Sequence, residues 1–220
     1  MSKEHSKPPI SRTDVSSLQL YRLSVYLRCL KRLQEEDVEQ VSSKVLAERF
    51  DLSASLIRKD LAQFGELGIR GHGYDVDKLA ARLVDLFGLG QEQRVVVVGM
   101  GKLGSALAGH FDGSHGAFHV VAGFDQDRRK IGTAIGTVVV QPIQDIADVV
   151  AETGAQIGLL TVPREAAQEC LDGMIVAGIR SVLNFAPIRL VAEPPTNLRN
   201  VDLRIHLEEL AFLSHSDDPE

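Results

Sequence analysis

The chain has 220 residues, 44% of them hydrophobic, and a formal net charge of −6. It has no apolar run near the ~20 residues that span a bilayer, and its N-terminal segment lacks the apolar core of a signal peptide, so we expect a cytoplasmic protein. The two cysteines, Cys29 and Cys170, have no CxxC or Cys/His spacing, which argues against a disulfide framework or a zinc site and indicates buried thiols. Residues 1–87 hold fourteen Lys and Arg against thirteen Asp and Glu, so the acidic excess belongs to the rest of the chain.

The first part of the chain has the pattern of a helical domain. Residues 1–16 are polar, include two adjacent prolines, and are expected to form a flexible arm. From Ser17 on, apolar residues recur at the spacing of one helical face, at Leu20, Leu23, Leu27 and Leu30. Glycines and polar residues at 86–93 then separate a helical pattern from an apolar strand, so the first domain is expected to cover residues 17–88.

Two short helices joined by a tight turn are predicted inside this domain. The first covers residues 44–50, the sequence DLS forms the turn, and the second begins at Ser53 or Ser55 and runs to about Phe64. Such a pair is the helix-turn-helix unit. The glycine-rich sequence GELGIRGHGY that follows is typical of a β-hairpin reaching out as a wing.

The second helix and the hairpin carry side chains that suit DNA. A helix in the major groove places arginine and lysine near guanine edges and phosphates, while a wing reaches the neighbouring backbone or minor groove. The expected DNA-contacting residues are Ser55, Arg58, Lys59, Arg70 and His72. A helical pair that binds no DNA stays an alternative, because Asp60 and Glu66 dilute the basic face.

The segment RVVVVGMGKLGSAL is an apolar strand, a glycine turn and the start of a helix. Gly99, Gly101 and Gly104 satisfy GxGxxG, in which the first glycine permits the turn, the second lets a pyrophosphate approach, and the third lets helix pack on strand. The helix N-terminus offers free N–H groups to the phosphates. About twenty residues later the strand HVVAGFD ends in Asp125, which suits the hydroxyls of an adenosine ribose. The pattern predicts a dinucleotide site.

The charges beside the ribose predict which dinucleotide binds. The carboxylate of Asp125 would repel a 2′-phosphate, which favours NAD over NADP. Arg128 and Arg129 either pair with such a phosphate or are solvated charges at a helix start, and the second interpretation is favoured.

Strands and helices alternate through the rest of the chain, which is typical of an open, mostly parallel sheet with helices on both faces. We expect a strand at 137–140, a helix at 144–153, the strand QIGLLTV, a helix at 163–177 and the strand RSVLNF. Ligands of such sheets lie beyond the carboxyl ends of the strands. The rim of that crevice is expected to include Thr161, Val162, Pro163, Asn184, Phe185 and Pro187. Thr161 is alternatively a strand-end hydroxyl without a ligand.

The last segment, residues 201–220, is predicted to hold a terminal helix. Its apolar stripe consists of Leu203, Leu207, Leu210 and Ala211, widened by Ile205, Phe212 and Leu213. A helix this apolar must be buried, either on its own sheet or in a partner subunit.

Several segments together resemble the Rex redox-sensing transcriptional repressors of bacteria: LIRKDLAQFGELGIRGHGY, VVVVGMGKLGSAL, GFDQD, LLTVPREAAQ, LNFAP and NVDLRIHLEELAFL. The resemblance covers essentially the whole chain. It implies a homodimer with winged-helix DNA-binding domains (17–88), Rossmann NAD(H)-binding domains (89–200) and C-terminal helices (201–220) exchanged between subunits. It also implies a repressor that binds a palindromic operator, an inverted repeat, when NADH is scarce and leaves it when NADH accumulates.

The resemblance further implies roles for single residues. The phosphate-binding turn would consist of Gly99, Met100, Gly101, Lys102, Leu103 and Gly104, with Asp125 as the ribose carboxylate. Asp202, at the head of the exchanged helix, matches the carboxylate near the nicotinamide, and Arg22 is its candidate ion partner in the DNA-bound state. His110 stands where many relatives carry tyrosine, and is either a pH-dependent part of the switch or a solvent-facing residue.

NADH and NAD+ differ by one positive charge on the nicotinamide ring, so an apolar lining from Phe185, Pro187 and Phe212 would favour the reduced form. Two rival interpretations remain. An NAD-dependent dehydrogenase with an accessory helical domain would need a positioned acid or base, which the crevice segments do not offer. A repressor that senses CoA or another nucleotide would keep the DNA-binding module and change only the ligand.

Overall fold

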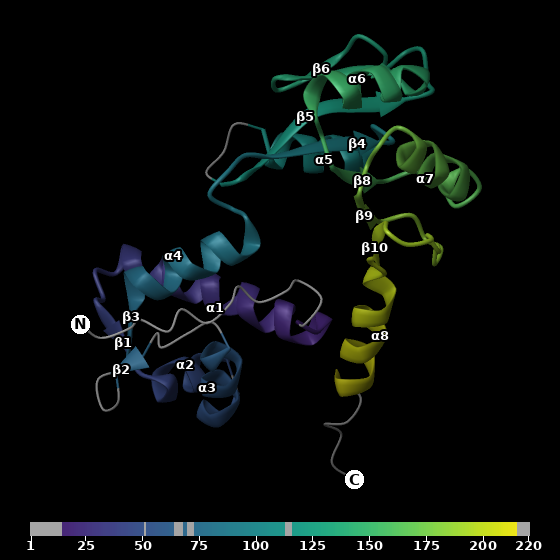
Figure 1. Ribbon diagram of the computed structural model, residues 1–220. Helices are drawn as coiled ribbons and strands as arrows, with labels where there is room; N and C mark the ends of the chain where they lie inside the picture. Colours follow the sequence, from purple (N-terminus) through teal and green to yellow (C-terminus); the bar gives the residue numbers. More distant parts are fainter. Residues whose placement is uncertain (1–14, 51, 64–67, 70–72, 113–115, 215–220) are drawn as a thin grey trace. The chain divides into compact units, whose positions relative to one another are not determined.

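The computed structural model describes residues 15–50, 52–63, 68–69, 73–112 and 116–214 (Figure 1). The chain divides into two compact units, residues 1–90 and 91–220, and each is considered by itself. Residues 1–14 of the expected arm lie outside the described residues. Within the described segments, no helix has both the length and the apolar character that a membrane crossing requires.

The helices of the first unit begin and end at residues suited to capping. They are α1 (Ser17–Glu35), α2 (Ser43–Phe50), α3 (Ala54–Ala62) and α4 (Val76–Phe87). Side-chain oxygens of Ser16, Ser53 and Asp75 accept hydrogen bonds from the first-turn N–H groups of α1, α3 and α4. Gly88 ends α4 in the left-handed conformation, with φ at 69°. The predicted pair of short helices is therefore confirmed as α2 and α3.

A small antiparallel sheet completes this unit. Its strands are β1 (Gln40–Val41), β2 (Gly68–Ile69) and β3 (Gly73–Asp75), in the order β1-β3-β2. The pairing of β2 with β3 confirms the hairpin behind the second helix and gives the unit its winged-helix arrangement. The predicted DNA contacts Arg70 and His72 lie outside the described residues.

The core of the first unit is formed where α1 packs against α4 and the helix pair. Its fully buried side chains include Leu23, Tyr26, Leu30, Leu46, Ile57, Leu79 and Leu83. Of the apolar face predicted for the first helix, Leu23, Leu27 and Leu30 are buried and Leu20 is half-buried. The thiol of Cys29 belongs to the same core, as predicted.

The second unit contains, among its described residues, a seven-stranded sheet in the order β10-β9-β8-β4-β5-β7-β6. The strands are β4 (Gln93–Val98), β5 (Phe118–Asp125), β6 (Ala134–Ile135), β7 (Val138–Pro142), β8 (Ile157–Leu160), β9 (Ser181–Asn184) and β10 (Asn197–Asn200). All neighbours are parallel except β6 and β7. Without β6 this is the strand order of dinucleotide-binding sheets, whose direction of winding reverses between β4 and β8 and leaves a crevice there.

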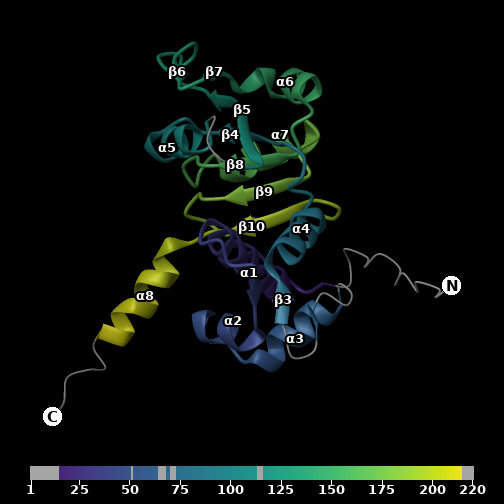
Figure 2. The ribbon, with the colours of Figure 1, turned by 90° about the vertical axis from the view of Figure 1, so that its left-hand side faces the viewer.

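Helices cover both faces of this sheet, as predicted. They are α5 (Lys102–His110), α6 (Ile146–Thr153), which follows a 3-10 turn at Ile143–Asp145, and α7 (Ala167–Val176). Val95 and Val97 of β4 share a core with Ala108 of α5, whereas Val96 and Val98 belong to the core that includes α6 and α7. Figure 2 shows α5 on one side of the sheet and α6 and α7 on the other.

The helix predicted over residues 163–177 begins later, at Ala167. The N–H of Ala166 donates to the carbonyl oxygen of Pro163 at 3.2 Å, and the N–H of Ala167 donates to Arg164 at 3.4 Å. These bonds close a turn over residues 163–166, so Pro163 precedes the helix instead of occupying its first turn. The exposed Pro163 side chain therefore stays at the end of β8, beside the crevice.

The terminal helix α8 (Leu203–Ser214) has no buried residue within its own chain. Leu207 is 63% exposed and Phe212 is 74% exposed. Figures 1 and 2 show the helix extending away from the sheet after β10. The interpretation that α8 covers its own sheet is therefore wrong, because neither of the two hydrophobic cores of that sheet contains a residue of α8.

Candidate nucleotide and DNA sites

The glycine turn between β4 and α5 is shaped by close backbone approaches. Gly99 has φ at 96°, and a Cβ there would lie 2.7 Å from the carbonyl oxygen of Thr161. A Cβ on Gly104 would overlap the carbonyl oxygen of Gly99 and lie 2.7 Å from Thr161 Oγ1. A Cβ on Gly101 would meet no atom within 4 Å, so the turn is open at this glycine alone of the three. This is the division of roles that a pyrophosphate-binding turn requires.

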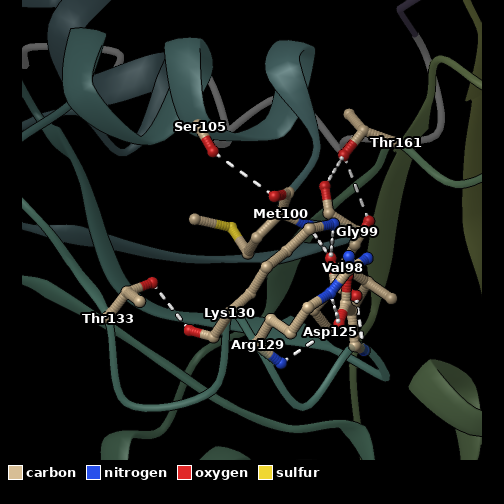
Figure 3. Close-up of polar contacts among 10 residues, drawn as sticks. Val98, Gly99, Met100, Ser105, Asp125, Arg129, Lys130, Thr133 and Thr161 are labelled. Carbon is tan, nitrogen blue, oxygen red and sulfur yellow. Dashed lines mark hydrogen bonds and ion pairs between the residues drawn. The ribbon is translucent and has the colours of Figure 1, made fainter.

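The carboxylate of Asp125 lies directly under this turn (Figure 3). Its Oδ2 accepts hydrogen bonds from the N–H of Met100 at 2.9 Å and from Lys130 Nζ at 2.7 Å. Its Oδ1 accepts the N–H of Asp127 at 2.9 Å. Burial raises the pKa of Asp125, but the hydrogen bonds from Lys130, Asp127 and Met100 outweigh it and leave the pKa below its ordinary value. The side chain of Asp125 is therefore ionised, and its hydrogen bonds fix its orientation at the carboxyl end of β5.

A cavity of about 500 Å³ opens beside Asp125 at the crevice between β4 and β8. Of the residues predicted for the nucleotide site, it is lined by Gly99, Gly101, Asp125, Thr161, Val162 and Pro163. Its other lining residues are Val98, Phe124, Gln126, Asp127, Lys130, Ile143, Ala166 and Cys170. The volume and the mixture of apolar walls with a few convergent polar groups are those of a small-molecule site.

Lys130 is a charged lining residue that the sequence pattern did not indicate. Arg128 and Arg129 were the cations considered near the ribose, yet Arg129 is 89% exposed and pairs with Asp127 at 2.8 Å, outside the Asp125 contact. Lys130 instead reaches Asp125 from a side chain that is 38% exposed. Its place directly after two arginines in GFDQDRRK offered no signal, because the turn after β5 decides which of the three cations points inward.

Two further residues of the cavity wall, Thr161 and Cys170, differ from expectation, the first in its hydrogen bonds and the second in its burial. The hydroxyl of Thr161 donates to the carbonyl oxygens of Gly99 at 2.6 Å and Val98 at 3.2 Å, so it fastens the glycine turn to the end of β8. Cys170, expected to be buried, is half-buried at the cavity wall, and burial raises the pKa of its thiol.

The other predicted nucleotide residues do not line this cavity. Asn184 is fully buried, and its side chain bonds the carbonyl oxygen of Ile188, the N–H of Ala186 and the side chain of Asn200, which shapes the loop after β9. Phe185, Pro187, Asp202, Met100, Lys102, Leu103 and Gly104 are likewise absent from its lining. Met100 is buried under the turn and donates its N–H to Asp125, so its contribution is to hold the carboxylate.

The second helix of the predicted helix-turn-helix pair is α3. Ser55, Arg58 and Lys59 are exposed on it. Arg58 donates from Nη1 to Ser43 Oγ at 2.9 Å, which ties it to the start of α2, and Ser55 shares a hydrogen bond with Ser53. Asp60, expected to dilute the basic face, is 3% exposed and faces the core, so that expectation is wrong for Asp60. Glu66 lies outside the described residues.

The residues proposed as a switch lie as follows. Arg22 forms a bidentate ion pair with Asp60, with Nε–Oδ2 at 2.6 Å and Nη2–Oδ1 at 2.7 Å. His110, the last residue of α5, is exposed and contacts the Phe111 ring edge-on, with ring centroids 4.9 Å apart. Asp202 is exposed, and its Oδ1 accepts the N–H of Arg204 at 3.0 Å at the start of α8. No group of three or more potential metal ligands occurs among the residues that the structure describes.

Comparison with protein families divides the chain as the structure does. The model described as "Putative DNA-binding protein N-terminus" matches residues 14–62, and the model described as "CoA binding domain" matches residues 90–188. The redox-sensing transcriptional repressor Rex of Desulforamulus reducens is 44% identical over 87% of this chain and 91% of its own length. The redox-sensing transcriptional repressor Rex 1 of Thermotoga maritima is 41% identical over 87% of this chain and 91% of its own length.

Solved structures of a Rex-family repressor also match the chain over most of its length. The crystal structure of RSP in complex with β-NAD+ and operator DNA matches with a TM-score of 0.86 and 33% identity, over 92% of this chain and 94% of that chain. The structure of RSP with β-NADH matches with a TM-score of 0.82 and 33% identity, over 92% and 95% of the two chains. RSP is described as a Rex-family repressor. On identity across nearly the full length of its relatives, this chain belongs to the Rex family of redox-sensing transcriptional repressors.

Proposed function

We propose that this protein is a homodimer that binds an inverted-repeat operator through α3 and the wing, and that NADH bound at the glycine turn releases it. The observation that carries the proposal is the open turn at Gly101 beside the carboxylate of Asp125, in one cavity of about 500 Å³. The RSP complexes with β-NAD+, β-NADH and operator DNA support it. Its place of action would be the cytoplasm, where bacterial operators and NADH meet.

The adenosine half of the nucleotide is assigned to the cavity. Among the described residues, Asp125 Oδ1 accepts one hydrogen bond, from Asp127, and a carboxylate oxygen has two lone pairs, so one remains for a ribose hydroxyl. The pyrophosphate would lie at Gly101 against the free N–H groups that begin α5, near Lys102 and Leu103. Asp125 would repel the 2′-phosphate of NADPH, and Lys130 would reduce that repulsion without abolishing it, since it is already paired.

The nicotinamide half is assigned to the apolar residues Phe185, Pro187 and Phe212. None of these lines the cavity of a single chain, and Phe212 is exposed on α8. A second copy that seats α8 would therefore complete the nicotinamide end. Burying the positively charged ring of NAD+ there costs more than burying the neutral ring of NADH, which makes NADH the releasing form.

DNA reading is assigned to the N-terminal half of α3. Ser55 and Arg58 are exposed there, and Lys59 is exposed in the last turn of the same helix; a major groove admits an α-helix. Arg70 and His72 of the wing would contact the adjacent backbone or minor groove. Removal of Arg58 should lower operator affinity more than affinity for unrelated DNA, because a guanine contact discriminates by about 1–3 kcal/mol.

The switch is assigned to Asp202, with Arg22 as its ion partner in the DNA-bound state and His110 as a further contact. In the structure Asp60 occupies Nε and Nη2 of Arg22, which leaves Nη1 for Asp202. Arg28 on the same helix is exposed and has no ion pair among the described residues, so it is the matched comparison. A double-mutant cycle of Asp202→Asn with Arg22→Met should show coupling in operator affinity; coupling only with Arg28→Met would move the partner to Arg28.

The deciding experiment is fluorescence anisotropy of the protein on a labelled inverted-repeat operator at one stated salt concentration, with a scrambled duplex as control. We expect NADH to release the operator at far lower concentration than NAD+, and CoA to have no effect. Operator binding that no nucleotide releases would refute the ligand assignment, and release by CoA alone would replace it. Equal binding to operator and scrambled DNA would refute specific repression.

A further inference from the structure

The recognition helix α3 carries a buried carboxylate that the nucleotide and DNA assignments do not use. Asp60 is 3% exposed, although it directly follows the exposed Lys59. An acidic side chain in a protein core is costly unless it is paired and hydrogen-bonded. Its position one residue after the expected DNA-contacting cation makes its partners informative.

Among the described residues, the hydrogen-bond donors to this carboxylate lie on α1. Arg22 donates from Nε to Oδ2 at 2.6 Å and from Nη2 to Oδ1 at 2.7 Å, and the Tyr26 hydroxyl donates to Oδ2 at 3.0 Å. Arg22 and Tyr26 are one helical turn apart, so they approach Asp60 from the same face of α1. The Tyr26 side chain is itself fully buried. Burial and the contact with Asp60 raise the pKa of Tyr26, which keeps its hydroxyl a donor.

This network differs in kind from the apolar packing around it. Contacts such as that of Ile57 with the core hold α3 against the domain but are non-directional. A planar guanidinium and a carboxylate joined at two points fix distance and rotation together. Because Asp60 is adjacent to Lys59 and two residues from Arg58, fixing its side chain fixes the rotation of α3 about its axis. Arg58 adds a second restraint through its hydrogen bond to Ser43 on α2.

We propose that Asp60, held by Arg22 and Tyr26, is a positioning residue that sets the rotation of α3 and thereby the sequence specificity of operator binding. Buried ion pairs contribute little net stability compared with apolar side chains of similar size, so the role assigned to this one is the orientation that its two-point geometry fixes. The network therefore acts on which bases Arg58 and Lys59 reach, and not on whether the protein attracts DNA. The inference rests on the proposed function, since it needs an operator to read.

The test compares binding to operator and to a scrambled duplex, without nucleotide, for the wild type and five variants. Tyr26→Phe removes one bond, Asp60→Asn removes the charge, and the triple variant Arg22→Met, Asp60→Leu, Tyr26→Phe replaces the network with apolar side chains. Asp202→Asn removes only the proposed Arg22–Asp202 pair, so the loss in the triple variant counts for the network only where it exceeds the loss in Asp202→Asn. Lys31→Met, an exposed cation elsewhere on α1, is the control for lost positive charge. Thermal melting followed by circular dichroism checks that each variant is folded.

We expect the folded triple variant to lose operator affinity by ~10-fold or more, on the scale of one lost base contact. Its affinity for scrambled DNA should change no more than that of Lys31→Met, and its salt dependence should stay that of the wild type, so the specificity ratio falls. Tyr26→Phe should lie between the wild type and Asp60→Asn. A folded triple variant with the wild-type specificity ratio would overturn the inference, as would equal losses on both duplexes. A wild type without operator preference would instead refute the proposed function itself.

Discussion

At the scale of single residues, two glycines of the β4–α5 turn, Gly101 and Gly104, should respond differently to one added methyl group. Gly104→Ala should abolish nucleotide binding and lower stability by about 1–3 kcal/mol, because its Cβ would overlap the Gly99 carbonyl. Gly101→Ala should fold like the wild type, since its Cβ meets no protein atom, yet bind NADH at least ~10-fold more weakly if the pyrophosphate occupies that space. Calorimetric titration with NADH and thermal melting measure both effects.

Gly109→Ala is the matched control for that series. Gly109 is on the same helix, and the one atom near its added Cβ is Ile135 Cγ2 at 3.9 Å. It should bind NADH as the wild type does and melt no lower, because alanine favours the helix. Unchanged NADH affinity in Gly101→Ala would contradict the assignment of the pyrophosphate to this turn.

The ion pair of Asp125 with Lys130 should make the stability of the protein depend on pH. Because the pKa of Asp125 is below its ordinary value in the folded state, its contribution to stability is present above the ordinary pKa of about 4 and is lost as the pH falls through the folded value. Asp125→Asn should therefore be less stable than the wild type at pH 7, by on the order of 1 kcal/mol. The two should converge below pH ~4.

Thermal melts from pH 7 to pH 3 test this prediction for Asp125. Glu152→Gln, which changes an exposed carboxylate of α6, is the control and should follow the wild type at every pH. A constant difference between Asp125→Asn and the wild type over the whole range would show that the charge of Asp125 does not contribute.

The roles of residues were predictable from the sequence where the backbone geometry requires a residue type at a fixed spacing. They were not predictable where the role depends on the direction in which a side chain points. GxGxxG followed by Asp125 predicted the turn and the carboxylate because both depend on spacing along the chain. Lys130 and Asp60 were missed or misjudged for one reason. The local turn or helix rotation decides whether such a charge faces inward, and only the folded structure shows that Lys130 and Asp60 do.

At the scale of elements, strong local patterns predicted the right structure and weak ones did not. Four consecutive valines predicted the buried strand β4, and the glycine-rich hairpin predicted β2 and β3. The start of α7 was placed at Pro163 because proline suits a first helical turn, but hydrogen bonds at 163–166 form a separate turn. The edge strand β10 has the sequence NLRN, which is polar and mostly exposed, so no alternation of apolar residues indicated it.

The exposed apolar side chains of α8 predict that this helix joins two subunits. Leu207 and Leu210 are 63% and 60% exposed on a helix without buried residues, and an apolar surface of this kind marks an interaction site. Leu207→Asp should weaken dimerisation ~100-fold, since burying a leucine contributes about 1.5–3 kcal/mol and an unpaired buried carboxylate costs more. Sedimentation equilibrium measures the change.

Glu208→Gln, at the neighbouring exposed position of α8, is the control and should leave the dimer intact. A wild type that is monomeric at micromolar concentration would contradict the role of α8 in dimerisation. A Leu207→Asp variant that dimerises like the wild type would instead place the interface on another surface.

At the scale of the whole molecule, the cavity proposed for the nucleotide and the helix α3 proposed to read DNA belong to different compact units, so redox sensing requires coupling between them. A ligand shifts such an equilibrium only by the difference between its affinities for the two states. Thermodynamic linkage then demands that operator DNA weaken NADH binding by the same factor by which NADH weakens operator binding. We expect that factor to be about 5–150, the usual range of allosteric coupling.

Two titrations measure this reciprocity at one salt concentration: NADH binding with and without saturating operator, and operator binding with and without saturating NADH. Scrambled DNA should leave the NADH affinity unchanged at the same duplex concentration, because it does not select the operator-bound state. Gly101→Ala should shift the NADH titration but keep the same coupling factor once saturated, since it alters binding at the turn and not the link between the units. Unequal factors in the two directions would mean that a further ligand or a change of subunit association accompanies release.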